Sequence, residues 1–159
     1  MFRLVPPSPE QGYLASIQAF RPSFELLVTA GDEHVRASAL VGGLMVECLL
    51  KAYVVHNSSK SGAPTKTLQG HDLELLWSDA VQAGLSINAD VPDWCRVLNC
   101  LHYGNKDPEN TGTQSNVPFD LRYPLRYQSK MNGLSFPVPS ELHAGVLSLL
   151  LTVNQALSS

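Results

Sequence analysis

The longest apolar run of the chain lies within residues 34–56 and includes the string ALVGGLMVECLLKAYVV. Its apolar positions fall on every face of a helix, as expected for the central helix of a bundle rather than for a surface helix. A membrane span is the competing interpretation, but Glu47 and Lys51 lie in the middle of the run, and Gly42 and Gly43 weaken it as a helix. The pattern therefore predicts a buried central helix in a soluble domain.

Four further segments repeat apolar residues at helical spacing. They predict helices over about residues 11–30, from 70 to 84, from about 90 and from 140 onward. Pro22 predicts a kink near Phe20 or two helical pieces, because proline removes a backbone donor and clashes with the preceding turn. Negative charge at Asp72 favours the start of the third helix. Asp90 is predicted to cap the fourth helix, with a proline in its first turn.

Each of these four helices has one predicted core face. The residues on these faces are Tyr13, Ile17, Phe20, Phe24 and Leu27 in the first helix, Leu73, Leu76, Trp77 and Ala80 in the third, Trp94, Val97, Leu98 and Leu101 in the fourth, and Leu142, Val146, Leu149, Leu150, Val153 and Leu157 in the last. An all-α fold follows from these five segments.

The segment 104–139 is too long for a plain connection between two helices of a bundle. Its first half is polar and rich in turn-forming residues, whereas apolar and polar residues alternate over 121–128. Asn132 and Gly133 are typical of a two-residue hairpin turn. We therefore expect this insertion to include a small β-hairpin before the last helix.

Composition indicates one soluble domain spanning residues 1–159. The chain has 159 residues and a formal net charge of −3, which is enough for one core and does not indicate a general phosphate-binding surface. No secretory signal is recognisable at the N-terminus, so a cytoplasmic location is expected. Cys48, Cys95 and Cys100 form no CxxC pair, which favours free thiols. We expect neither a metal site nor a cofactor.

Glu47 and Lys51 are the first candidate functional pair. A glutamate four residues before a lysine is the favourable orientation for an ion pair on one helix face. The pair is either a structural one at the edge of the core or the lining of a polar pocket or dimer seam, where it can neutralise a charge on Arg122 or His71.

Arg96, Asn99 and His102 are the second candidate group, in the string CRVLNCLHYGN. Cleavage of RNA without a metal needs a base for the 2′-hydroxyl proton and a cation for the developing phosphorane charge. On a straight helix Arg96 and His102 point roughly 120° apart. A surface or capping role is therefore the alternative.

Arg122 and Arg126 are the third group. They are expected on one face of the predicted strand, where they can hold a phosphate or carboxylate through bidentate bonds. Alternatively they are solvated charges that protect an edge strand. His34, His56 and His143 have no evident partners in the sequence and are taken as structural.

The string ALVGGLMVECLLKAY, the GHDL of residues 70–73 and the RYP of residues 122–124, in this order, resemble the HEPN superfamily of prokaryotic helical domains over about residues 10–157. The resemblance implies an up-and-down antiparallel bundle of four or five helices that pairs as a homodimer. It also implies work in a toxin–antitoxin, defence or RNA-processing system, with a cognate antitoxin or a nucleotidyltransferase-like protein as a further partner.

Ribonucleases of this family have an arginine, four to six residues and a histidine, completed at the dimer interface. Arg96 and His102 match this spacing, although Val97 stands where a polar residue usually follows the arginine. The resemblance thus implies a metal-independent endoribonuclease in which His102 acts as base or acid, Arg96 stabilises phosphate charge and Asn99 orients the scissile group.

The alternative function is a non-catalytic dimeric module. It would bind a small anionic ligand, RNA or a partner protein through Glu47, Lys51, Arg122, Tyr123 and Arg126. The mild negative charge of the chain favours this function, whereas the spacing of Arg96 and His102 favours the ribonuclease.

Overall fold

The computed structural model describes residues 7–61, 68, 70–103 and 136–158, and every element in these ranges is helical. In chain order the elements are α1 (Pro9–Thr29), the short 3-10 helix η1 (Asp32–His34), α2 (Val35–Ser61), α3 (Leu73–Gln82), α4 (Asp93–His102) and α6 (Pro139–Leu157). The all-α bundle predicted from the sequence is confirmed for these residues. The predicted hairpin falls on residues 121–138, of which only 136–138 are described, and these three are not in a strand.

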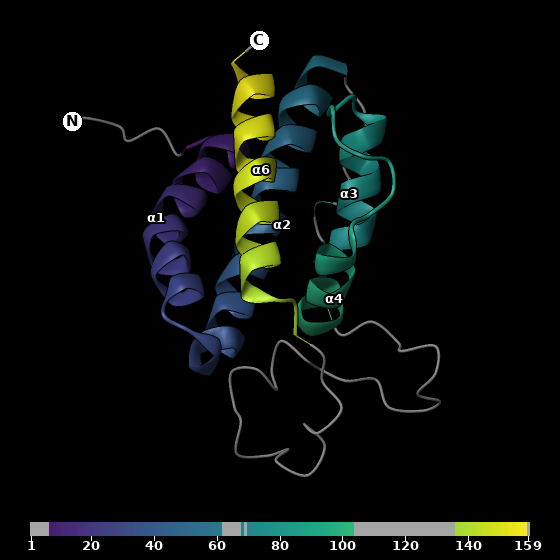
Figure 1. Cartoon of the computed structure of the whole chain (residues 1–159). Helices are drawn as coiled ribbons and strands as arrows, with labels where there is room; N and C mark the ends of the chain where they lie inside the picture. The colour runs from purple at the N-terminus through teal and green to yellow at the C-terminus, as the bar shows by residue number, and fades with distance from the viewer. Residues whose placement is uncertain (1–6, 62–67, 69, 104–135, 159) are drawn as a thin grey trace, which may run out of the picture.

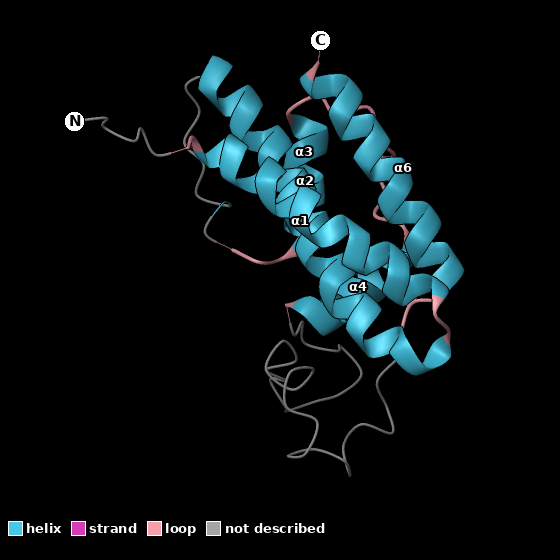
Figure 2. Ribbon diagram, turned by 90° about the vertical axis from the view of Figure 1, so that its left-hand side faces the viewer, coloured by secondary structure: helices cyan, strands magenta, loops and turns pink. Residues whose placement is uncertain are grey.

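The helices form an up-and-down arrangement around α2. Figure 1 shows α1 descending, α2 rising, α3 and α4 descending one after the other, and α6 rising across the front between α1 and the α3–α4 pair. Figure 2 shows the same bundle from the side. The third position of the bundle is therefore filled by two short helices instead of one long helix, which places the end of α4 beside the middle of α2.

Helix α1 continues through Pro22 as a single element. It begins with a capping box, in which the Ser8 hydroxyl accepts from the Gln11 backbone N–H at 3.2 Å and the Gln11 side chain accepts from the Ser8 N–H at 2.9 Å. Pro22 is exposed, so its missing donor costs no buried hydrogen bond. The alternative of two separate helical pieces is therefore wrong. Ile17, Phe24 and Val28 form the buried stripe.

Helix α2 packs against α1, α3, α4 and α6, and it continues to Ser61, beyond the predicted end at residue 56. By length and composition, the stretch Asp32–Ser58 is the one candidate membrane span in the described part of the chain. Within its most apolar window, 72% is buried inside the bundle. Burial of this extent is what the core helix of a soluble protein shows, in agreement with the role predicted for this segment.

The starts of α3 and α4 differ from each other. Asp72, whose negative charge was predicted to favour the start of this helix, is the N-cap of α3: its Oδ1 accepts from the N–H groups of residues 74 and 75 at 3.0 and 3.2 Å. The predicted cap at Asp90 is wrong: α4 begins at Asp93, and its N-cap is Pro92, which makes no side-chain hydrogen bond. The Asp90 backbone N–H instead donates to the Asn88 side chain at 3.0 Å.

The core face of α4 is rotated relative to the prediction. Trp94 and Val97 are only partly buried. Trp94 packs closely over Gly145 of α6 and meets Trp77 edge to face, with ring centroids 6.2 Å apart. The rotation brings the polar side chains of Asn99 and His102 inside the bundle. The buried residues of α4 are Cys95, Leu98, Asn99, Leu101 and His102.

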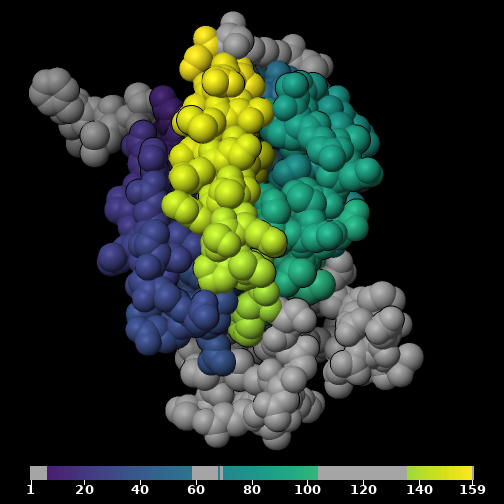
Figure 3. Space-filling model, in the orientation of Figure 1, coloured from purple at the N-terminus to yellow at the C-terminus, as the bar shows by residue number. Residues whose placement is uncertain are grey.

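Helix α6 lies across the face of the bundle that the space-filling view shows, between α1 and the α3–α4 pair (Figure 3). Its buried residues are Leu142, Val146, Leu149, Leu150 and Val153, which confirms all of its predicted core positions except Leu157, a partly buried residue.

None of the three cysteines, all of which are described, forms a disulfide; Cys95 is buried, Cys48 is partly buried and Cys100 is exposed. Burial raises the pKa of Cys48 to about 11 and that of Cys95 to about 12. These thiols are therefore weak nucleophiles and weak metal ligands near neutral pH.

Candidate functional site

The carboxylate of Glu47 lies inside the bundle, and Lys51 is its partner on the same helix. The Lys51 ammonium donates to Glu47 Oε1 at 2.7 Å, and both residues are buried. The sequence predicted this pair from its i,i+4 spacing. Because this pair lies in the interior, the ammonium and the carboxylate have lost their contacts with water. Each charge is therefore stabilised by its protein partners.

His102 reaches the same carboxylate from α4. Its Nε2 lies 2.6 Å from Glu47 Oε2, and the ring is buried. Gly43 makes room for this ring, since a Cβ atom at position 43 would come within 2.7 Å of His102 Nδ1. A glycine one turn before Glu47 on α2 therefore permits the close approach of the α4 histidine to the carboxylate.

His71 is the third partner of the carboxylate. It directly precedes Asp72, the cap of α3, and its Nδ1 lies 3.0 Å from Glu47 Oε1 and 3.1 Å from Oε2. Its side chain is 65% exposed, so it links the buried carboxylate to the surface. The rings of His71 and His102 meet edge to face, with centroids 6.3 Å apart. We call Glu47, Lys51, His71 and His102 the Glu47 cluster.

The Glu47 cluster keeps its carboxylate ionised. Burial raises the pKa of Glu47, but hydrogen bonds from His102, Lys51 and His71 together outweigh burial and lower the pKa from 4.5 to about 2. Because a carboxylate only accepts, each imidazole nitrogen that faces it must carry a proton in this arrangement. The cluster therefore presents three nitrogen donors around one negative charge.

Asn99 joins α4 to the start of α3. Its Oδ1 accepts from the Leu73 N–H at 2.8 Å, and its Nδ2 donates to Asp72 Oδ1 at 3.1 Å and to Glu74 Oε1 at 3.3 Å. Asn99 is fully buried. Its amide thus satisfies groups at a helix N-terminus, and by holding that terminus in place it also positions His71.

Arg96 lies apart from this arrangement. Its side chain is 52% exposed, and its guanidinium lies 3.6 Å from the carboxylate of Asp93, whereas His102 is buried against Glu47. Within one chain, therefore, the predicted catalytic residues Arg96, Asn99 and His102 each have a different partner. Arg122, Tyr123 and Arg126 lie outside the described residues.

Sequence reasoning named His71 only as a neighbour of Glu47 and did not include it among the site residues. The contacts that form the cluster span 24 residues between Glu47 and His71 and 55 residues between Glu47 and His102. The one local signal was the GHDL string, in which a histidine precedes a helix cap. His56, for which the sequence indicated no partner, has its Nδ1 3.2 Å from the carboxylate of Glu10.

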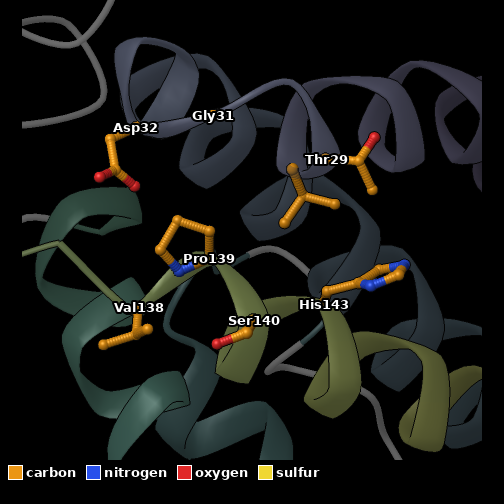
Figure 4. Close-up of a pocket in the computed structure, with 8 residues that line it drawn as sticks. Thr29, Gly31, Asp32, Val138, Pro139, Ser140 and His143 are labelled. Carbon is orange, nitrogen blue, oxygen red and sulfur yellow. The ribbon is translucent and has the colours of Figure 1, made fainter.

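A separate shallow depression of about 410 Å³ lies where α1, η1 and α6 meet. It includes no residue of the Glu47 cluster. Figure 4 shows Asp32 at one end and His143 at the other, with Pro139 between them. Its charged and titratable side chains therefore do not converge on one point, as they do around Glu47.

Comparisons with protein-family models, with curated proteins and with solved structures each found no match to this chain.

Proposed function

We propose that this chain is a HEPN-like, homodimeric binding module that holds a small anionic group beside His71, rather than a ribonuclease that uses Arg96 and His102. One observation supports the proposal: Lys51, His71 and His102 converge on a single carboxylate, and one of them reaches the surface. The homodimer, the cytoplasmic location and a cognate antitoxin or nucleotidyltransferase-like partner belong to the same proposal and rest on the HEPN resemblance.

In this proposal His71 is the contact to the ligand. Glu47 binds Nδ1 of the ring, so the edge that bears Nε2 is the one directed away from the cluster. In its protonated form the ring would donate a charge-assisted hydrogen bond through Nε2 to a phosphate or carboxylate oxygen. Lys51 balances the charge of Glu47 from the buried side. Arg122, Tyr123 and Arg126 are proposed from the sequence as further donors to the same anion.

The exposure of the two histidines favours binding over cleavage. A general base must come within about 2.6–3.2 Å of the proton that it removes. His102 is buried and its Nε2 is occupied by Glu47, so it can take this role only if the bundle opens. Arg96 is exposed beside Asp93, on the part of α4 that does not contact the cluster.

The test is to measure binding of a short 5′-phosphorylated single-stranded RNA in EDTA, with inorganic phosphate as competitor. His71→Ala should weaken binding about 10- to 150-fold, because one charge-assisted hydrogen bond contributes about 1.5–3 kcal/mol. His34→Ala is the matched control, since His34 is also an exposed histidine beside a carboxylate, 3.5 Å from Glu33. This control should bind like the natural chain, and gel analysis should find the RNA intact.

Two results would contradict the proposal. Equal binding by the natural chain and His71→Ala would remove His71 as the anion contact. Cleavage of the RNA in EDTA that is lost in both Arg96→Ala and His102→Ala would establish the ribonuclease instead.

A further inference from the structure

Three atoms of the Glu47 cluster have the chemistry and spacing of metal ligands. Glu47, His71 and His102 each offer one ligand atom, and these atoms all lie within 4.8 Å of one another. Two imidazole nitrogens and one carboxylate oxygen form a common catalytic-type donor set for zinc. Among the described residues this is the one group of at least three histidine, cysteine or acidic side chains that converges in this way.

The distances are close to those of a tetrahedral centre. Zinc binds imidazole nitrogen and carboxylate oxygen at about 2.0–2.2 Å, so neighbouring ligand atoms lie about 3.3 Å apart. Glu47 Oε2 lies 2.6 Å from His102 Nε2 and 3.1 Å from His71 Nδ1. An ion between them therefore needs Oε2 and His71 Nδ1 to separate by a few tenths of an ångström, and Oε2 and His102 Nε2 to separate by about 0.7–1 Å. His71, exposed at the surface, can supply the first of these movements, whereas the second must come from the buried Glu47 and His102 side chains.

The surroundings distinguish the two oxygens of Glu47. Oε2 faces both imidazoles, whereas Oε1 accepts from Lys51 at 2.7 Å and lies 3.0 Å from His71 but is not the oxygen that contacts His102. Lys51 can therefore stay on Oε1 as an outer hydrogen-bond partner while Oε2 binds the ion, an arrangement that orients ligating carboxylates in metal sites. The ammonium also adds positive charge, which favours an anionic fourth ligand such as hydroxide or a carboxylate.

We propose that Glu47, His71 and His102 bind one divalent transition-metal ion of the zinc class, through Oε2, Nδ1 and Nε2 respectively, with the fourth position taken by a ligand from solution. Each imidazole then carries its proton on its other ring nitrogen. The inference does not rest on the proposed binding of an anion, because it requires only these three side chains. It revises the expectation of no metal site, which considered ligands close together in the sequence.

The experiment is a titration of tag-free, metal-free protein with Co²⁺ in a buffer without phosphate. One equivalent should produce the visible d–d absorption of four-coordinate cobalt, and Zn²⁺ should abolish it. His71→Ala should bind at least about tenfold more weakly while keeping the helical circular dichroism of the natural chain, because His71 is exposed. His34→Ala, the matched control, should titrate like the natural chain.

Three results would overturn the metal site. They are no visible absorption at stoichiometric Co²⁺, equal affinity in His71→Ala and the natural chain, and a thiolate-to-cobalt charge-transfer band, which would assign the ion to Cys48 or Cys100. The RNA assay contains EDTA and the cobalt assay contains no anionic ligand, so failure of one proposal does not affect the test of the other.

Discussion

Two neighbouring glycines of α2 lie in two different kinds of packing. A Cβ on Gly42 would meet the Phe24 ring at 3.0 Å and Leu142 at 3.5 Å, whereas a Cβ on Gly43 would meet the imidazole of His102 at 2.7 Å. Close approach therefore buries apolar surface on the α1 and α6 side of α2, and a titratable ring on the α4 side. The comparison shows that one core helix can use the same small residue for hydrophobic packing and for placing a polar cluster.

The two sides should respond differently to conditions. Burial of Phe24 and Leu142 depends on apolar area and is nearly independent of pH. The α4 side contains a buried carboxylate whose charge is held by hydrogen bonds, so its contribution to stability follows the protonation of Glu47.

Among these predictions, Glu47→Ala should cause the largest loss of unfolding free energy. It leaves Lys51 and His102 buried without their common acceptor, and loss of one partner of a buried ion pair costs roughly 3–5 kcal/mol. Glu25→Ala is the control, because Glu25 forms an i,i+4 pair with Arg21 at 2.8 Å on the surface and exposed pairs contribute about 0–1 kcal/mol. Urea unfolding measures both. Similar losses in the two variants would mean that water enters the Glu47 cluster.

Acid should cause the second-largest loss of stability, through the Glu47 cluster on the α4 side of α2. The pKa of Glu47 in the folded chain, about 2, is below its ordinary value of 4.5, so its contribution is complete above pH 4.5 and is lost as the pH falls toward 2. A shift of this size corresponds to about 3 kcal/mol of unfolding free energy. Denaturant unfolding of metal-free protein between pH 5 and pH 2 tests this. Glu47→Gln should show a smaller slope in this window, and an equal slope would assign the acid sensitivity to other groups.

Replacing either of the two glycines with alanine should change the stability least. Gly42→Ala should change stability by less than about 1 kcal/mol, because the edge of the Phe24 ring can move slightly and alanine favours the helix by about 1 kcal/mol. Gly43→Ala should be less stable than Gly42→Ala by about 1–2 kcal/mol, because its methyl group displaces a hydrogen-bonded ring in a full core. Thermal unfolding and the NMR signals of the His102 ring measure the difference. Equal stability with unchanged His102 signals would contradict the close packing at Gly43.

Much of the fold was predictable because it depends on local patterns. Spacing of apolar residues predicted five helical segments, and the negative charge of Asp72 indicated the start of α3, where its side chain bonds to amides two and three residues away. The Asp90 prediction failed because α4 begins only at Asp93, with Pro92 at the N-cap position. The core face of α4 was predicted in part: Leu98 and Leu101 are buried, whereas Trp94 and Val97 are only partly buried, and Trp94 packs closely over Gly145 on another helix.

The candidate site was predictable only in part, for the same reason. Glu47 and Lys51 lie one helical turn apart, so the sequence by itself determined their ion pair, and the apolar residues around them determined that it is buried. The contacts of His71 and His102 with that carboxylate were decided by the tertiary structure. They depend on where α3 and α4 lie against α2 and on the space at Gly43, and distances between separate helices are not encoded in the spacing of residues along the chain.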